Sequence, residues 1–324
     1  MTTNLKTLAT LALFACSAGQ LQAQASPPSP LTIIVPFAPA GPNDLLGRAV
    51  AERLGGVTGR TVVVENKVGA ASIIAADQVA RARPVGNTVL MATQTTLVAN
   101  QYLYKSLRYD SAKSFIPVAL LSQQPPVLVV PANSPATRAA DLVERMRRAP
   151  TPFAYGSAGN GTIHHLAAEL LRSTENLHLT HVPYKGSSPA LVDLIAGRTQ
   201  LMFVDLSSAA PHIKSGALRI LMVAGPRRLK AFPNVPTGRE AGFASMSLTA
   251  WAVLAVPAAT PAQTVEALNR DTNAAVQKLA GEDRFANDGV DLRGDLSVQQ
   301  LAEFIKTERP IWEQVIRRSG ATAD

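Results

Sequence analysis

Two ten-residue segments of this chain are nearly identical, although they lie far apart in the sequence. VLVVPANSPA occupies residues 127–136 and VLAVPAATPA occupies residues 253–262, with seven of the ten positions identical. Each copy reads as a short apolar β-strand stopped by a proline, after which a second proline opens a helical pattern. The domain-sized segment between the copies favours a chain that crosses twice between two lobes and builds a hinge around a ligand cleft. Two ordinary strand–helix junctions of one sheet are the alternative.

The first 25 residues are predicted to be a cleavable secretory signal peptide, which places the mature protein in the periplasm. The apolar stretch over residues 8–15 is too short to remain as a membrane span, and small residues precede a cleavage site after Ala25. Cleavage there removes Cys16, the only cysteine, so we expect neither a disulfide nor a cysteine–metal site. Lipoprotein anchoring at Cys16 is the less favoured alternative, because bulky Phe14 stands where a small residue is usual.

Composition limits the class of partner. About 300 residues remain after the signal peptide, which is enough for two domains. The formal net charge is +8, but the basic residues are spread along the chain and only 5% of residues are aromatic. Because a nucleic-acid-binding protein would be expected to show a basic stripe with stacking aromatics, no nucleic-acid partner is expected. The charge is interpreted either as a surface that favours small anionic ligands or as a solvated surface with no role.

Apolar strands alternate with amphipathic helices, which predicts an α/β fold of two doubly wound lobes with mostly parallel sheets. The predicted strands cover residues 31–35, 61–64, 88–92, 153–155, 177–182, 200–204 and 218–224. The predicted helices include residues 73–82, 137–148, 162–173, 188–196, 261–279 and 297–318. We expect the last two helices to pack on the first lobe, and the final helix to kink at Pro310. The predicted limits are residues 26–126 and 253–324 for lobe 1 and residues 127–252 for lobe 2.

The strongest local motif is YGSAGNGT at residues 155–162, between a predicted strand and a predicted helix. Its three glycines let backbone N–H groups point outward, and the helix start adds unpaired donors and a positive dipole end. The motif therefore predicts a loop that binds a carboxylate or phosphate, with a purely structural turn as the alternative. The residues assigned to it are Ser157, Ala158, Gly159, Asn160, Gly161 and Thr162. A P-loop lysine is absent, and Tyr155 stands where a hydrolase elbow needs glycine.

A counterpart loop in the first lobe also joins a strand to a helix. Its candidate ligand-binding residues are Phe37, Ala38, Ala40, Gly41, Pro42 and Asn43. The side chains of Asn43 and Asp44 are interpreted as the helix N-cap and the first-turn acid. The backbone N–H groups of the loop then remain free to bind an anion. Ala70 belongs to a third and weaker turn of this type, over residues 69–72.

Single polar residues add less specific candidates. His165 and Glu169 have helical i,i+4 spacing, but without an HExxH pattern or a third ligand no metal site is predicted. His165 is instead expected to support the glycine-rich loop or to touch the anion. Tyr184 either lines the cleft or lies on the surface. Asp205 follows an apolar strand, where it would either fix a ligand amine or hydroxyl or only cap the next helix.

The chain resembles the extracytoplasmic solute receptors of the tripartite tricarboxylate transporters, called Bug receptors, over essentially the whole mature sequence. The similar segments are IIVPFAPAGPNDLLGR, VVVENKVGA, YGSAGNGTIHHLAAELL, HVPYKGSSPALVDLIAGR, FPNVPTGREAGF and WAVLAVPAATPA. Their order and spacing also agree with the family. Family members usually have paired glycines in the first loop, whereas this chain has Ala40-Gly41-Pro42.

The resemblance implies a type II periplasmic binding protein fold that closes around a small mono- or dicarboxylate, with no cofactor and no catalysed reaction. It also implies that the loops at residues 37–43 and 157–162 hold the carboxylate through backbone amides and bridging waters, with Asp205 at the cleft floor. The implied partner is a membrane permease, or a sensor kinase that uses the same signal, and the receptor is expected to be a monomer.

A secreted hydrolase is the enzymatic alternative. It would use Ser157 as nucleophile, His165 or His181 as base, and Asp205 as the third group. This hypothesis requires a contact between the serine and a histidine, which the sequence alone does not show.

Overall fold

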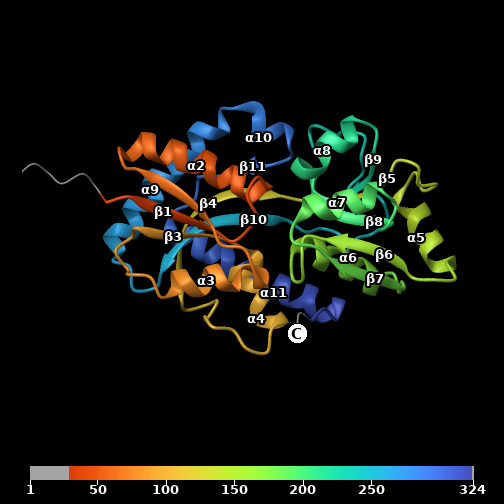
Figure 1. The fold of residues 1–324 in the computed structure, drawn as a ribbon, viewed down its shortest axis with the longest axis horizontal. Helices are drawn as coiled ribbons and strands as arrows, with labels where there is room; N and C mark the ends of the chain where they lie inside the picture. The colour runs from red at the N-terminus through yellow and green to blue at the C-terminus, as the bar shows by residue number, and fades with distance from the viewer. Residues whose placement is uncertain (1–28, 323–324) are drawn as a thin grey trace, which may run out of the picture.

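The computed structural model describes residues 29–322, so the predicted signal peptide and Cys16 lie outside the described residues. Two β-sheets lie side by side with helices around them (Figure 1). The larger sheet contains β1 (Leu31–Val35), β2 (Val62–Asn66), β3 (Thr88–Thr93), β4 (Phe115–Gln124), β10 (Ala250–Pro257) and β11 (Asp291–Leu292). The smaller sheet contains β5 (Pro126–Pro131), β6 (Phe153–Ser157), β7 (Leu179–Pro183), β8 (Leu201–Asp205) and β9 (Leu218–Val223). The strand orders are β11-β4-β10-β3-β1-β2 and β7-β6-β8-β5-β9.

Helices cover both faces of each sheet. Those of the larger-sheet lobe are α2 (Pro42–Thr58), α3 (Ile73–Ala80), α4 (Asn100–Leu103), α9 (Ala262–Ala280), α10 (Asp283–Asn287) and α11 (Val298–Ser319). This lobe also contains a 3-10 turn, η1 (Ala70–Ser72), and a π-helical turn, η2 (Thr95–Ala99). The smaller-sheet lobe contains α5 (Ala139–Arg148), α6 (Ile163–Thr174), α7 (Ser187–Ile195) and α8 (Leu206–Lys214). In the part of the chain that the structure describes, no helix is long and apolar enough to span a membrane.

Both sheets are mixed, which corrects the prediction of mostly parallel sheets. β1 pairs with β2 and β3 in parallel, and β6 pairs with β7 and β8 in parallel. β10 runs antiparallel to β3 and β4, and β5 runs antiparallel to β8 and β9. A parallel neighbour requires a crossover connection. The chain enters β5 directly from β4 of the other sheet, with only Pro125 between the two strands, so no helix precedes β5.

The two copies of the repeated segment therefore lie in different sheets. The strand of the first copy is β5 in the smaller sheet, and the strand of the second copy is β10 in the larger sheet. The chain passes from one sheet to the other directly between β4 and β5, and it returns through residues 224–249. Side chains on both faces of β5 are buried, which explains its continuous apolar sequence.

The final helix packs on the larger-sheet lobe, as expected from the sequence, and also contacts the smaller-sheet lobe. α11 contacts η2 and β4 of the larger-sheet lobe and α6 of the smaller-sheet lobe. The Arg172 guanidinium of α6 donates to the carbonyl oxygen of Ser319, the last residue of α11, at 2.7 Å. Trp312 is buried in an apolar cluster that includes residues of both lobes. Pro310 lies inside this helix.

Candidate ligand-binding site between the lobes

The loop after β1 turns sharply before α2 begins. Its candidate residues are Phe37, Ala38, Ala40, Gly41, Pro42 and Asn43. Gly41 is the N-cap of α2, so the prediction that Asn43 caps this helix was wrong. The physical reason is Pro42, which occupies the first helical position, where a missing N–H costs little. The next N–H groups of the first turn have no partner inside the helix and remain available to an anion.

Asp44 anchors this loop as a first-turn acid, as predicted. Its carboxylate accepts hydrogen bonds from Ala40 N at 2.8 Å, Arg48 Nε at 2.9 Å and Asn66 Nδ2 at 2.8 Å. Ala40 has a left-handed φ of 61°, which directs its N–H toward that carboxylate. Burial alone would raise the pKa of Asp44, but these hydrogen bonds lower the pKa below its ordinary value. The Ala40 amide is therefore used by the protein and is not available to a ligand.

The third turn, with Ala70, lies within η1 before α3. Ala71 and Ser72 both have left-handed φ angles, 47° and 73°. The Ser72 hydroxyl lies 2.7 Å from the Thr96 hydroxyl, and Asn100 Nδ2 donates to the Ala71 carbonyl at 2.9 Å. Side chains that follow β3 therefore hold this strained turn in place.

The glycine-rich loop meets the other lobe at Gly161. Thr95 Oγ1 donates to the Gly161 carbonyl at 3.2 Å, and a Cβ added to Gly161 would stand 2.7 Å from Leu103 Cδ1. Gly161 has a φ of 72°, and its N–H donates to His165 Nδ1 at 3.1 Å. His165 is thus engaged in supporting the loop. Sequence reasoning missed Thr95, and the only available hint was the polar run QTT after an apolar strand.

Two amides of the same loop remain unused. Thr162 is the N-cap of α6, and its hydroxyl accepts from His165 N and donates to the Gly159 carbonyl. Within residues 29–322, the backbone N–H groups of Ala158 and Asn160 donate to no other group. Together with the start of α6, they are donors of the kind that the predicted carboxylate- or phosphate-binding loop requires.

Ser157 contacts His181, whose strand pairs with its own. The Ser157 hydroxyl lies 2.6 Å from His181 Nε2 and also donates to the Gly159 carbonyl at 3.2 Å. The rings of His165 and His181 stack with centroids 4.1 Å apart. Burial lowers the pKa of both histidines to about 4, so both are neutral near pH 7.

Among the described residues, the Asp205 side chain contacts His164 and Gln124 and forms no hydrogen bond with Ser157 or His181. Its Oδ2 is 3.2 Å from His164 Nε2, and its Oδ1 accepts from Gln124 Nε2 at 3.2 Å. Gln124 belongs to β4, so this second contact joins the two sheets. Asp205 is the N-cap residue of α8 but forms no side-chain capping hydrogen bond. Its carboxylate therefore contacts His164 within its own lobe and Gln124 of the other lobe.

Tyr184 interacts with Asp193, within its own lobe. Its hydroxyl donates to Asp193 Oδ2 at 2.7 Å. Burial of the hydroxyl and, to a smaller extent, this hydrogen bond raise the pKa of Tyr184 to about 12. The Tyr184 carbonyl would be 3.3 Å from a Cβ on Gly159, so the backbone of Tyr184 borders the glycine-rich loop.

A cavity of about 40 Å³ lies between residues of the two lobes. It is lined by Pro42, Asn43, Leu45, Leu46, Ser122, Gln124, Ser207, Phe285, Asp288 and Val290. The structure thus brings two predicted residues of the first loop beside Gln124, which contacts Asp205. The residues of the glycine-rich loop do not line this cavity. They lie instead against η2 and α4.

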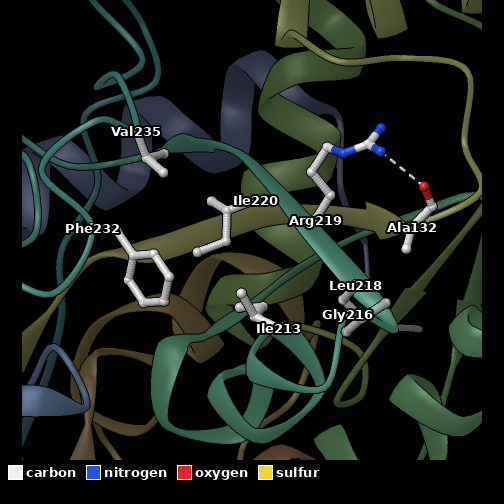
Figure 2. A pocket seen from close by; sticks show the side chains of 8 residues that line it. All are labelled: Ala132, Ile213, Gly216, Leu218, Arg219, Ile220, Phe232 and Val235. Carbon is white, nitrogen blue, oxygen red and sulfur yellow. Dashed lines mark hydrogen bonds between the residues drawn. The ribbon is translucent and has the colours of Figure 1, made fainter.

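A larger hollow of about 300 Å³ lies on the smaller-sheet lobe, beside edge strand β9 (Figure 2). Its lining is mainly apolar, with Ile213, Ile220, Phe232 and Val235 shown in Figure 2. The guanidinium of Arg219 donates to the carbonyl of Ala132 at 2.9 Å. No ligand-binding residue was predicted here. Among the residues that the structure describes, no group of three or more His, Cys, Asp or Glu side chains could hold a metal ion.

The chain is similar to known proteins over most of its length. The family model described as "Tripartite tricarboxylate transporter family receptor" matches residues 46–321. The chain is 35% identical over 307 residues to "UPF0065 protein in tcbD-tcbE intergenic region" of Pseudomonas sp. (strain P51), covering 94% of this chain and 91% of that protein. It is 30% identical over 318 residues to "Protein BugT" of Bordetella pertussis, covering 97% of each.

Three solved structures superpose on the chain. One, described as a periplasmic transporter, has a TM-score of 0.86 at 33% identity and covers 93% of this chain and 100% of its own. R. palustris Rpa4515 with adipate has a TM-score of 0.86 at 31% identity, with coverages of 91% and 99%. MatC (Rpa3494) from Rhodopseudomonas palustris with bound malate has a TM-score of 0.82 at 29% identity, with coverages of 89% and 99%. These similarities confirm the predicted two-lobed periplasmic binding protein fold.

Proposed function

Because the chain belongs to the family of tripartite tricarboxylate transporter receptors, as its resemblance to the Bug receptors predicted, we propose that it captures a small carboxylate between its lobes and delivers it to a membrane permease. The family consists of solute-binding proteins rather than enzymes. The contact between Ser157 and His181 therefore serves to shape the glycine-rich loop, and Asp205 is not placed to complete a catalytic triad.

The observation that supports this function most strongly is the meeting of the glycine-rich loop with the opposite lobe at Gly161. The unused amides of Ala158 and Asn160 lie in the same loop, and the start of α2 offers further donors from the other lobe. Charge-assisted hydrogen bonds from such amides replace the hydration shell of a carboxylate. Two structural relatives were solved with small carboxylates, adipate and malate, which favours the same ligand class here.

Lobe closure provides the signal to the partner. The proposed lobes comprise residues 26–126 with 253–324, and residues 127–252, with β5 and β10 as the strands nearest the hinge. Export through the predicted signal peptide would place the receptor in the periplasm, where a permease reads the closed form. A sensor kinase that reads the same closed form would require the same ligand binding.

Thermal unfolding of the mature protein against a panel of small carboxylates tests this function. A ligand that binds only the native state stabilises it by about 2.7 kcal/mol at one hundred times its dissociation constant. We expect a rise in Tm with one or a few acids and none with their amides. Equal shifts for acids and amides, or no shift after unfolding, washing and refolding to remove any copurified ligand, would contradict the proposal.

A further inference from the structure

The hollow beside β9 lies along an open edge of the smaller sheet. β9 ends the strand order of this sheet, and β5 is its neighbour on the inner side. In an antiparallel pair, successive residues direct their backbone N–H and C=O groups alternately toward the partner strand and away from it. The Ala217 carbonyl accepts from Ala132 N at 2.9 Å and therefore faces β5. The backbone groups of Leu218 and Ile220 are consequently directed outward, where no other strand of the described residues pairs with them.

The same edge already binds an extended segment at its other end. Val223 N donates to the Pro236 carbonyl at 2.9 Å, and Gly238 N donates to the Val223 carbonyl at 2.8 Å, which forms a parallel bridge. The segment before this bridge does not continue along β9, because it turns where Val235 N donates to the Phe232 carbonyl at 3.1 Å. The first half of β9 is therefore left without an outer neighbour, on an edge that accepts one elsewhere.

The hollow offers different chemistry on the two faces of this edge. Its apolar lining residues pack against the cluster that α7 and α8 bury on one face of the sheet: Ile213, Ile220, Phe232 and Val235. Arg219 lines the hollow from the other face, since neighbouring residues of a strand point to opposite faces. Its guanidinium donates to three backbone carbonyl oxygens but pairs with no carboxylate within residues 29–322 (Figure 2). An extended segment at this edge would therefore meet apolar side chains on one face and a cation on the other.

The surroundings of the hollow are basic. Between Asp205 and Glu240 the chain holds six lysine and arginine residues and no acidic residue. Lys214 directly follows the lining residue Ile213, and Lys230 lies two positions before another lining residue. Both lysines are exposed, and neither forms an ion pair in the part of the chain that the structure describes. Because complementary charge steers association and fixes register, this surface favours an acidic partner.

We propose that the open edge of β9 docks an extended segment of a partner protein in which apolar residues alternate with acidic residues. The added strand pairs with the outward backbone groups of Leu218 and Ile220. Its apolar side chains enter the hollow, and its acidic side chains lie on the face of Arg219. All residues that line the hollow belong to the smaller-sheet lobe, so this docking goes beyond the proposed function and does not depend on carboxylate binding.

Two synthetic peptides of opposite charge test the docking. The acetylated and amidated peptide EVEVEVE has the proposed alternation, and KVKVKVK keeps the valines but reverses the charge. Isothermal titration calorimetry of the mature protein at low ionic strength should give a Kd of about 0.1 mM or lower for the acidic peptide. The basic peptide should bind at least about tenfold more weakly.

Backbone modification tests whether the bound peptide forms a strand. N-methylation of the valines and N-methylation of the glutamates remove N–H groups from opposite edges of the extended peptide. One of the two modified peptides should therefore lose binding, and the other should retain it. In NMR titrations, the unmodified acidic peptide should shift the amide signals of Leu218 and Ile220 and leave those of the glycine-rich loop unchanged.

Protein variants locate the binding at this edge. The double variant Lys214→Gln/Lys230→Gln should weaken binding of the acidic peptide by about threefold or more. Ile220→Thr keeps a β-branched side chain, removes apolar surface from the hollow and should also weaken binding. Lys113→Gln/Lys278→Gln is the matched control, because it removes the same charge from exposed positions of the larger-sheet lobe and should leave binding unchanged.

Several results would overturn this inference. They are equal binding of the acidic and basic peptides, binding of neither, equal weakening by the two lysine double variants, and amide shifts centred on the glycine-rich loop. Shifts at β9 that depend on protein concentration without any peptide would show that a second copy of the chain occupies this edge instead. Carboxylate capture between the lobes is tested separately by the thermal unfolding panel, so failure of one proposal leaves the other standing.

Discussion

Thr95 and Gly161 come from different lobes and are joined by a hydrogen bond, with Thr95 Oγ1 donating to the Gly161 carbonyl at 3.2 Å. Gly161 is also the point where the absence of a side chain matters, since a Cβ there would stand 2.7 Å from Leu103 Cδ1. The Gly161 N–H donates a hydrogen bond to His165 Nδ1. Gly161 therefore belongs to the glycine-rich loop, binds the His165 side chain that supports this loop, and forms the contact between the lobes.

Gly161→Ala should weaken carboxylate binding by about tenfold or more, because the new methyl group is strained at a φ of 72° and obstructs the contact with Leu103. Calorimetric titration with the best carboxylate measures the loss. Gly156→Ala is the matched control, since its Cβ would have ordinary contacts of 3.5 Å and its φ is not left-handed. Equal affinities of the two variants would contradict the role of Gly161 in closure.

Thr95→Val should weaken ligand binding several-fold while leaving Tm of the ligand-free protein nearly unchanged. The substitution keeps the shape of the side chain and removes only the hydroxyl that donates across the lobes, a contribution of about 0.5–1.5 kcal/mol. Thr95→Ser retains the hydroxyl and should bind as the wild type does. If the valine and serine variants bind equally, the hydrogen bond does not stabilise the closed form.

Stability should fall as the pH drops from about 6.5 toward 4. Burial lowers the pKa of His165 and of His181 from an ordinary 6.5 to about 4, so in this window the unfolded chain binds protons that the folded chain does not. The contribution is fully present above pH 6.5 and is lost as the pH falls toward 4. Urea denaturation at a series of pH values measures this slope.

Two histidine variants attribute the slope to these residues. His165→Asn retains an acceptor for the Gly161 N–H, and His181→Gln retains a polar group near the Ser157 hydroxyl. Each should flatten the dependence between pH 6.5 and 5, where most carboxylates remain ionised. A double variant with the wild-type slope would show that other groups cause the acid destabilisation.

Glu308→Leu should destabilise the protein by about 2 kcal/mol or more, because it leaves two indole donors without an acceptor. Trp251 Nε1 of β10 and Trp312 Nε1 of α11 both donate to Glu308 Oε2 at 2.9 Å. Glu303→Leu is the control on the same helix, since Glu303 forms only an exposed pair with Lys306. Urea denaturation at neutral pH compares them, and equal losses of stability would contradict a structural role for Glu308.

The secondary-structure predictions that the structure confirms depended on local patterns in the sequence. The strand–loop–helix arrangement at residues 155–162 was recognisable because strand, glycines and helix start are contiguous in the chain, while its role in anion binding stays a prediction. Asp44 was recognised as a first-turn acid for the same reason. The predicted limits of strands and helices near these motifs, such as Leu31–Val35, depended only on short apolar runs.

The predictions that failed, and the residues that were missed, depend on pairing between distant segments. The antiparallel direction of β10 follows from the return of the chain into the larger sheet, which no local pattern encodes. The contact between Ser157 and His181 follows from the register of β6 and β7. Thr95 and Gln124 act across the lobes on Gly161 and Asp205, and neither is part of a motif.

The central claim is that a carboxylate is held between the two lobes by backbone amides. Amide hydrogen exchange, followed by NMR with and without a saturating carboxylate, measures this most directly. The account predicts strong ligand-dependent protection of the N–H groups of Ala158 and Asn160 in one lobe and of Asn43 in the other, with no change around β9 and the larger hollow. Protection confined to one lobe, or centred on β9, would contradict capture between the lobes.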